Sequence, residues 1–265
     1  MIFDVLLPLI LFLITLVTLF LYFRYEKRIG SVFKEVKFRY YHAILLVVAT
    51  GIVVSVLMVI PGETIRNLYL GVYFLGFFLF TYLIVSKWYL AVLPPALFIA
   101  LYFSSYWNLF TFNLFAILFA IFVSVYLGSL FTWKTTAAFV VLITVMDIVQ
   151  VFITRYMVEA SEKLVELGLP VMLIIPTFPT EGSVIGLGLG DVFLAGLLGI
   201  QTAKKHGKKF ALASITAIAA GFLILQTVLL NYYPQAFPAT VLVISGWLIS
   251  LATRYIYKSS LLRHG

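Results

Sequence analysis

The sequence is dominated by continuous apolar runs that are long enough to cross a lipid bilayer. About 20 helical residues span the roughly 30 Å of hydrocarbon, and the chain of 265 residues is 63% hydrophobic and only 11% charged. Backbone polar groups in lipid must be satisfied within the spanning segment, and the runs lack the alternation that is typical of barrel strands. The sequence therefore predicts an all-α polytopic membrane protein.

Nine apolar runs, separated by polar breaks, are candidates for membrane spans. The fourth is the weakest, because it is short and is interrupted by Pro94 and Pro95. Without it the count would be eight, and every later segment would change sides of the membrane. The predicted spans are residues 2–23, 40–60, 68–86, 89–104, 110–131, 137–157, 185–203, 210–230 and 239–257.

Positive charge is concentrated on one side of this predicted topology. Six cations lie in the first loop, 24–39, and four in the seventh, 204–209; fifteen of the eighteen Lys and Arg residues fall on the side that holds the C-terminus. Because Lys and Arg accumulate in cytoplasmic loops, we expect the N-terminus outside and the C-terminus inside. The net charge of +8 then requires no nucleic acid partner, and the lack of cysteine excludes disulfides and thiolate metal sites or nucleophiles.

Two aspartates lie inside apolar runs: Asp147 in the sixth predicted span and Asp191 in the seventh. A carboxylate in hydrocarbon is costly unless it is paired or hydrated, so such an acid is by default a functional residue with a partner. At 1.5 Å per residue, Asp147 lies about 15 Å from the inner boundary and Asp191 roughly 9 Å from the outer one. In a core of about 30 Å their depths differ by roughly 6 Å. The natural partner of each acid is therefore the other.

Two carboxylates that share one site cannot both ionise cheaply, so one holds a proton while the other stays charged. Such a pair offers a general base for water and a general acid for a peptide carbonyl, without a metal ion or other cofactor. Gly186, Gly188 and Gly190 lack the side chains that would keep an extended backbone away from Asp191, although alternate glycines are also typical of helix packing. The residues alone leave three functions open: a protease, a channel or proton-coupled transporter using the same acids, and a silent scaffold that binds single helices.

The order of these motifs resembles the presenilin and signal peptide peptidase family of intramembrane aspartyl proteases, most closely its archaeal presenilin homologues. The similarity rests on Asp147 in the sixth span, Gly-Leu-Gly-Asp over 188–191 at the start of the seventh, Pro238-Ala239 at the start of the ninth, and the nine spans. Residues 137–257 carry these motifs, whereas the preceding part of the chain resembles the family in span number alone.

The resemblance implies one membrane domain, 1–265, with a five-span scaffold over 1–131 and a four-span catalytic part over 132–265. It implies an endopeptidase in the plasma membrane of an archaeon. Its expected partners are the bilayer and the transmembrane segments of substrate membrane proteins; no cofactor is expected, and a homo-oligomer is left open. The implied catalytic residues are Asp147 and Asp191, and the implied substrate-binding residues are Gly186, Gly188, Leu189, Gly190, Pro238, Ala239 and Thr240.

Two residues depart from the family pattern. Met146 stands before the first aspartate, where the family usually has tyrosine, and Thr240 stands in the ninth span where it usually has leucine. Both aspartates are intact, so activity is expected from a site with altered surroundings. The orientation inferred from charge resembles the signal peptide peptidase branch rather than presenilin.

The loop 158–184 joins the two aspartate-bearing spans. Residues 157–167 have helical spacing with a polar face and are expected to lie at the membrane interface. Residues 171–175 are a β-prone apolar run closed by prolines. The resemblance implies that this run and residues 183–187 pair with an unwound substrate by strand addition. The alternative is a loop that plugs the site.

Overall fold

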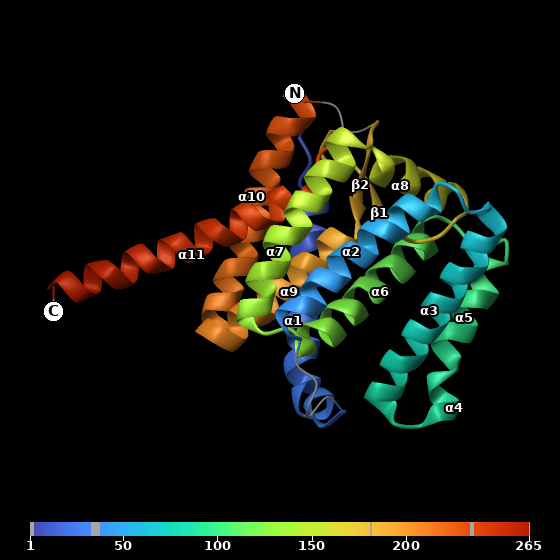
Figure 1. The fold of residues 1–265 in the computed structure, drawn as a ribbon, viewed down its shortest axis with the longest axis horizontal. Helices are drawn as coiled ribbons and strands as arrows, with labels where there is room; N and C mark the ends of the chain where they lie inside the picture. Colours follow the sequence, from blue (N-terminus) through green and yellow to red (C-terminus); the bar gives the residue numbers. More distant parts are fainter. Residues whose placement is uncertain (1–2, 33–37, 181, 234–235, 265) are drawn as a thin grey trace.

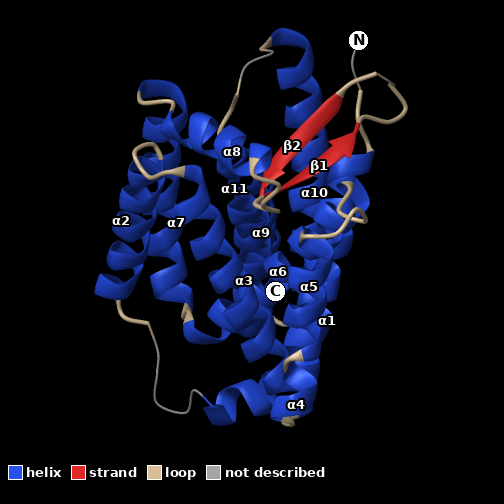
Figure 2. Cartoon of the chain, turned by 90° about the vertical axis from the view of Figure 1, so that its right-hand side faces the viewer, coloured by secondary structure: helices blue, strands red, loops and turns tan. Residues whose placement is uncertain are grey.

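The structure is a computed structural model that describes residues 3–32, 38–180, 182–233 and 236–264. Helices make up most of it, and a two-stranded sheet lies at the end of the bundle that also holds the N-terminus (Figure 1, Figure 2). In chain order the elements are α1 Leu6–Val32, α2 Tyr40–Leu57, α3 Gly62–Val85, α4 Trp88–Ala91, α5 Leu93–Tyr102, α6 Leu109–Leu130, α7 Trp133–Ile148, η1 Val149–Ile153, α8 Tyr156–Glu166, β1 Met172–Pro176, β2 Val184–Gly188, α9 Leu189–His206, α10 Lys208–Tyr232 and α11 Ala239–His264.

Within the described residues, seven helical segments are long and apolar enough to cross a membrane by length and composition. They are α1, α2, α3, α6, α7 together with η1, α10 and α11. Many of their apolar side chains are exposed, among them Phe20, Val48 and Leu75. A water-soluble protein rarely exposes so much apolar surface, whereas lipid covers it. The chain is therefore an α-helical, multi-pass membrane protein, as the sequence predicts.

The fourth predicted span is a broken helix. α4 and α5 together run from Trp88 to Tyr102, and the break falls at Val92, just before a helix start that contains Pro94 and Pro95. Proline lacks an N–H and crowds the preceding turn, so a helix accepts it in the first turn but not in the interior. At 1.5 Å per residue the segment is about 22 Å long, shorter than the hydrocarbon core of about 30 Å.

The seventh predicted span, 185–203, does not begin as a helix. Residues up to Gly188 form β2, because Gly186 and Gly188 favour a helix weakly and β1 supplies backbone partners. α9 then packs against α1, α6 and α10, and every residue from Asp191 to Ala203 is buried. α9 therefore occupies the centre of the bundle, where other helices rather than lipid surround it.

The first predicted span ends later than the sequence suggests. α1 continues to Val32, so Arg24, Lys27 and Arg28 lie on the helix rather than in a loop. Arg and Lys are good helix formers, and their long side chains extend from a helix end into water. The charges therefore mark an expected membrane boundary without ending the helix. Two other cations of the predicted loop, Lys34 and Lys37, lie outside the described residues.

Cations from several helices gather at one end of the bundle. Lys204, at the end of α9 remote from β2, donates to Gly128 O near the end of α6 at 2.8 Å and lies 5.2 Å from the ring centroid of Tyr22 on α1. Lys208 at the start of α10 lies 4.1 Å from the ring centroid of Phe23. These contacts join the charged ends of α1, α6, α9 and α10, so the charge asymmetry along the sequence is also an asymmetry of the folded bundle.

Cysteine labelling would test which end faces the cytoplasm. The chain has no cysteine, so a single one in place of exposed Glu166 on α8 or exposed Lys209 on α10 is a unique label. With the N-terminus outside, a membrane-impermeant maleimide added to sealed right-side-out vesicles should label Glu166→Cys. Lys209→Cys should react only after permeabilisation. The reverse pattern would indicate the presenilin-like orientation or a segment α4–α5 that does not cross.

The loop between α7 and α9 contains the predicted helix and strand. α8 buries Ala160 and Leu164 and exposes Glu159 and Glu166, which confirms an amphipathic helix close to the predicted residues 157–167. β1 confirms the β-prone run to within one residue. It pairs antiparallel with β2, and the two strands form a hairpin beside α8 and above the start of α9 (Figure 2).

Candidate active site

Asp147 and Asp191 line the same cavity, which has a volume of about 710 Å³. Residues of α7, α8, β2, α10 and the start of α11 form most of its wall. Both aspartates are buried, with 4% and 8% of their surface exposed. The fold thus brings the two acids that the sequence singles out into one mainly apolar cavity.

Asp147 lies close to the point where its helix changes from an α-helix to a π-helix. α7 ends at Ile148 and continues as the π-helix η1, in which Thr154 N donates to Val149 O at 3.0 Å, five residues back. Such wide turns are frequent at functional sites. The helical span ends at Ile153, four residues before the predicted boundary, because Arg155 adopts a left-handed backbone with φ 59°.

Asp191 lies in the first turn of α9, directly after β2. Gly188 is the N-cap residue, and its backbone is extended with φ −60° and ψ 142°, a conformation open to any residue. A Cβ added at Gly188 would lie only 3.2 Å from Asp191 Oδ2. The lack of a side chain at position 188 therefore leaves room for the carboxylate, independently of backbone flexibility.

One edge of the β1–β2 hairpin is closed and the other is open. Asn113 on α6 closes β1, because its Nδ2 donates to Ile174 O at 2.8 Å and its Oδ1 accepts from Ile174 N at 2.9 Å. The backbone N–H and C=O groups of Ile174 therefore point away from β2, and those of its partner Gly186 point away from β1. Because this direction alternates along an antiparallel pair, the N–H and C=O groups of Val184 and Gly188 also point away from β1. β2 has no second partner strand among the described residues, and all three residues line the cavity. The cavity therefore contains an open strand edge next to Asp191.

The structure separates the predicted site residues into two groups. Leu189 and Gly190 do not line the cavity: both belong to the first turn of α9, and Gly190 is exposed. Thr240 is buried behind the lining, beside Asp147. Gly186 and Gly188 thus belong to β2 and Gly190 belongs to α9, so the three glycines do not share one face. The predicted residues that line the cavity are Asp147, Asp191, Gly186, Gly188, Pro238 and Ala239.

The two departures from the family pattern lie on different sides of α7. Met146 faces α2, where its Sδ would be 3.5 Å from a Cβ at Gly51, and it does not line the aspartate cavity. Thr240 lies beside Asp147. Thr240 Oγ1 and Asp147 Oδ1 are both buried, and neither atom has a hydrogen-bond partner within the described part of the chain. The threonine therefore places a hydroxyl group beside the first carboxylate.

Asp4 and Gln226 form a buried polar cluster that was not predicted from the sequence. Asp4, which is 1% exposed, accepts from Leu6 N at 3.1 Å and Leu7 N at 3.3 Å in the first turn of α1, and from Phe178 N at 3.1 Å after β1. Its Oδ2 also accepts from Gln226 Nε2 on α10 at 3.0 Å. A lone amide inside an apolar span was the sequence feature that could have indicated this cluster, because buried polar groups in a membrane require partners.

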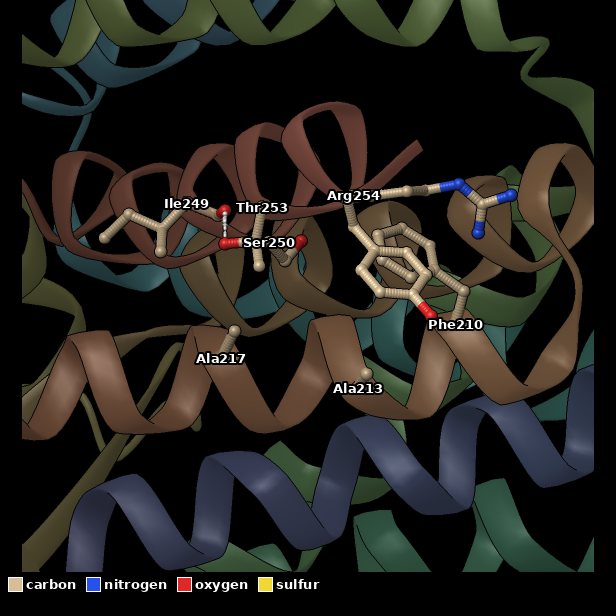
Figure 3. A pocket seen from close by; sticks show the side chains of 8 residues that line it. Phe210, Ala213, Ala217, Ile249, Ser250, Thr253 and Arg254 are labelled. Atoms are coloured by element: carbon tan, nitrogen blue, oxygen red, sulfur yellow. Dashed lines mark hydrogen bonds between the residues drawn. The ribbon is translucent and has the colours of Figure 1, made fainter. Parts of the chain in front are cut away.

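A second hollow lies between α10 and α11 (Figure 3). The two helices cross closely where a Cβ at Gly246 would come within 2.5 Å of Ala217 O, and they enclose a groove of about 610 Å³. In this groove the guanidinium of Arg254 lies 4.5 Å from the ring centroid of Phe210. None of the described residues that line it is an acid. The groove therefore lacks the acid and base groups of the aspartate cavity.

Comparison with protein-family models and with curated proteins gives no match to this sequence. The described residues also contain no group of three or more His, Asp or Glu arranged to hold a metal ion. The motifs of the sequence and the chemistry of the cavity are therefore the features that bear on function.

Proposed function

We propose that this protein is an intramembrane aspartyl endopeptidase in which Asp147 and Asp191 form the catalytic pair. The observation that carries the proposal is a single cavity that contains both buried carboxylates and the open edge of β2. A channel or transporter would use the acids as a proton relay, but it would leave the strand edge without a role. The edge offers main-chain hydrogen bonds to an extended peptide, which favours a protease.

In the proposed reaction the ionised carboxylate takes a proton from a water molecule whose oxygen attacks the peptide carbonyl carbon. The protonated partner donates a hydrogen bond to the carbonyl oxygen as negative charge develops there. When the tetrahedral intermediate collapses, the C–N bond breaks and the nitrogen receives a proton from the pair. The products are a carboxylic acid and an amine, and the pair returns to its singly protonated state.

The substrate in this proposal is a transmembrane segment of another membrane protein. A helical peptide bond is shielded by its own hydrogen bonds and neighbouring side chains, so the segment must unwind before water can attack. Pairing with β2 compensates for the hydrogen bonds lost on unwinding. The proposal includes nine crossings, with the broken segment α4–α5 and the central helix α9 added to the seven long spans.

Purified protein in detergent micelles tests this function. A model substrate with one transmembrane helix should be cut within that helix, and a Gly-Pro pair beside the cut site should raise the cleavage rate because it supplies part of the unwinding in advance. Proteoliposomes containing the protein should show no more proton flux than empty liposomes. Proton flux without cleavage would overturn the protease and support a transporter.

A further inference from the structure

An extended substrate on β2 would have a second edge that β2 cannot satisfy. Successive peptide groups of a strand point to opposite sides, so half of the substrate N–H and C=O groups would face away from β2. Leaving such groups unpaired in an apolar cavity is unfavourable. The opposite wall of the cavity therefore needs polar groups that bind the substrate backbone.

Gln226 supplies a buried acceptor without a partner. It is 5% exposed and lines the aspartate cavity from α10, and its Oε1 makes no hydrogen bond within the described residues. Asp147 Oδ1 is the other unpartnered buried atom among the described residues of this lining, and it belongs to the catalytic pair. Gln150 Oε1 is also unpartnered, but Gln150 lines a different groove, which lies between α2 and the segment formed by α7 and η1.

The orientation of the Gln226 amide is fixed by Asp4. Asp4 Oδ2 accepts from both Gln226 Nε2 and Leu7 N, and Oδ1 accepts from Leu6 N and Phe178 N. An ionised carboxylate can only accept hydrogen bonds, so the NH₂ group of the amide must face Asp4. A flipped amide would place its carbonyl oxygen against the carboxylate oxygen, and both are acceptors. The carbonyl oxygen of Gln226 is therefore left free to accept a hydrogen bond.

The place of Gln226 along the cavity follows from the same contacts. Phe178 lies in the segment that joins β1 to β2, so Asp4 and the amide of Gln226 lie toward the turn of the hairpin. Asp191 follows the other end of β2. Gln226 is therefore placed to bind a part of the substrate some residues away from the scissile bond, and it does not take part in the chemistry.

We infer that Gln226 Oε1 is a substrate-positioning acceptor, which takes a hydrogen bond from a backbone N–H on the edge of the substrate that faces away from β2. This inference rests on the proposed protease function. It assigns to Asp4 the task of holding the amide, and it requires no particular substrate side chain at the contact, because every residue except proline offers an N–H.

An amide-to-ester scan of the substrate tests the inference. Replacing one backbone N–H at a time by an ester oxygen removes a donor, and kcat/KM is compared for the wild type and Gln226→Met. For the wild type, one position should lose about fivefold to tenfold through the missing bond to Gln226. In Gln226→Met that penalty should vanish, while positions that pair with β2 keep theirs. The Gln226-dependent position should lie an odd number of residues from the positions that pair with β2.

The outcomes distinguish the inference from the function on which it rests. Cleavage with the same ester penalties in both enzymes would show a structural role for Gln226 and overturn the inference alone. Absence of wild-type cleavage would overturn the protease and the inference together. If Gln226→Met does not fold, Gln226→Asn withdraws the oxygen by one methylene and should lose the same penalty.

Discussion

Asp147→Asn and Asp191→Asn should each reduce cleavage of a single-span substrate by about 10²- to 10⁴-fold, the usual contribution of a general acid or base. Both side chains are buried in one cavity, and asparagine fills the same space without exchanging protons. The measurement is kcat/KM for the purified variants in detergent micelles. The double variant should be little slower than either single one, because the two acids act as a unit.

Folding controls make this result interpretable. Each aspartate variant should unfold at the wild-type temperature or above it, because the substitution removes a buried ionisable group. Ser250→Ala, in the groove between α10 and α11, changes a buried polar residue outside the cavity and should keep the rate within about twofold. If a folded variant of either aspartate kept more than a tenth of the wild-type rate, the two-aspartate mechanism would be wrong.

Gly188→Ala should reduce cleavage by about tenfold and Gly188→Val by about 10²-fold, since a displacement of the order of 1 Å at a catalytic group can cost that much. The added Cβ would lie 3.2 Å from Asp191 Oδ2, so the carboxylate must move. The valine branches would in addition approach the edge of β2 that is open to substrate. Steady-state kinetics with the same single-span substrate measure both effects.

Gly190→Ala is the comparison that isolates this effect. A Cβ at Gly190 would have no neighbour within 4 Å, and the residue is exposed in the first turn of α9. The rate should stay within about twofold, and stability should rise by up to about 1 kcal/mol because alanine favours a helix more than glycine does. Equal losses from alanine at 188 and at 190 would show that the contact with Asp191 is not the cause.

Membrane spans could be predicted because transfer into lipid depends mainly on the composition of each segment. Seven helical segments agree with predicted spans in place and character. The two exceptions have different causes, one within the segment and one in another part of the chain. Pro94 and Pro95 break the short fourth segment, and pairing with β1 turns the start of the seventh into a strand. Glycine is compatible with several backbone conformations, so the sequence around Gly186 did not reveal that boundary.

The cavity was only partly predictable. Asp147 and Asp191 were found because an acid in an apolar run is costly wherever that run lies in the fold. Gly190 was assigned to the same face as Gly188, but the start of α9 turns it outward. Asp4 and Gln226 were missed because each looks isolated in the sequence, and their hydrogen bond joins residues 222 positions apart.

The sequence by itself determined that the chain is a helical membrane protein, that its cations favour one end, and that two acids lie inside apolar segments. These are properties of single segments, fixed by the cost of placing charge and unpaired backbone in hydrocarbon. Only the tertiary structure decided that the acids share a cavity, that Asn113 closes β1 and leaves the edge of β2 open, and that Asp4 orients Gln226. Such contacts depend on how distant segments pack, because side chains and strand edges acquire partners only when the helices assemble.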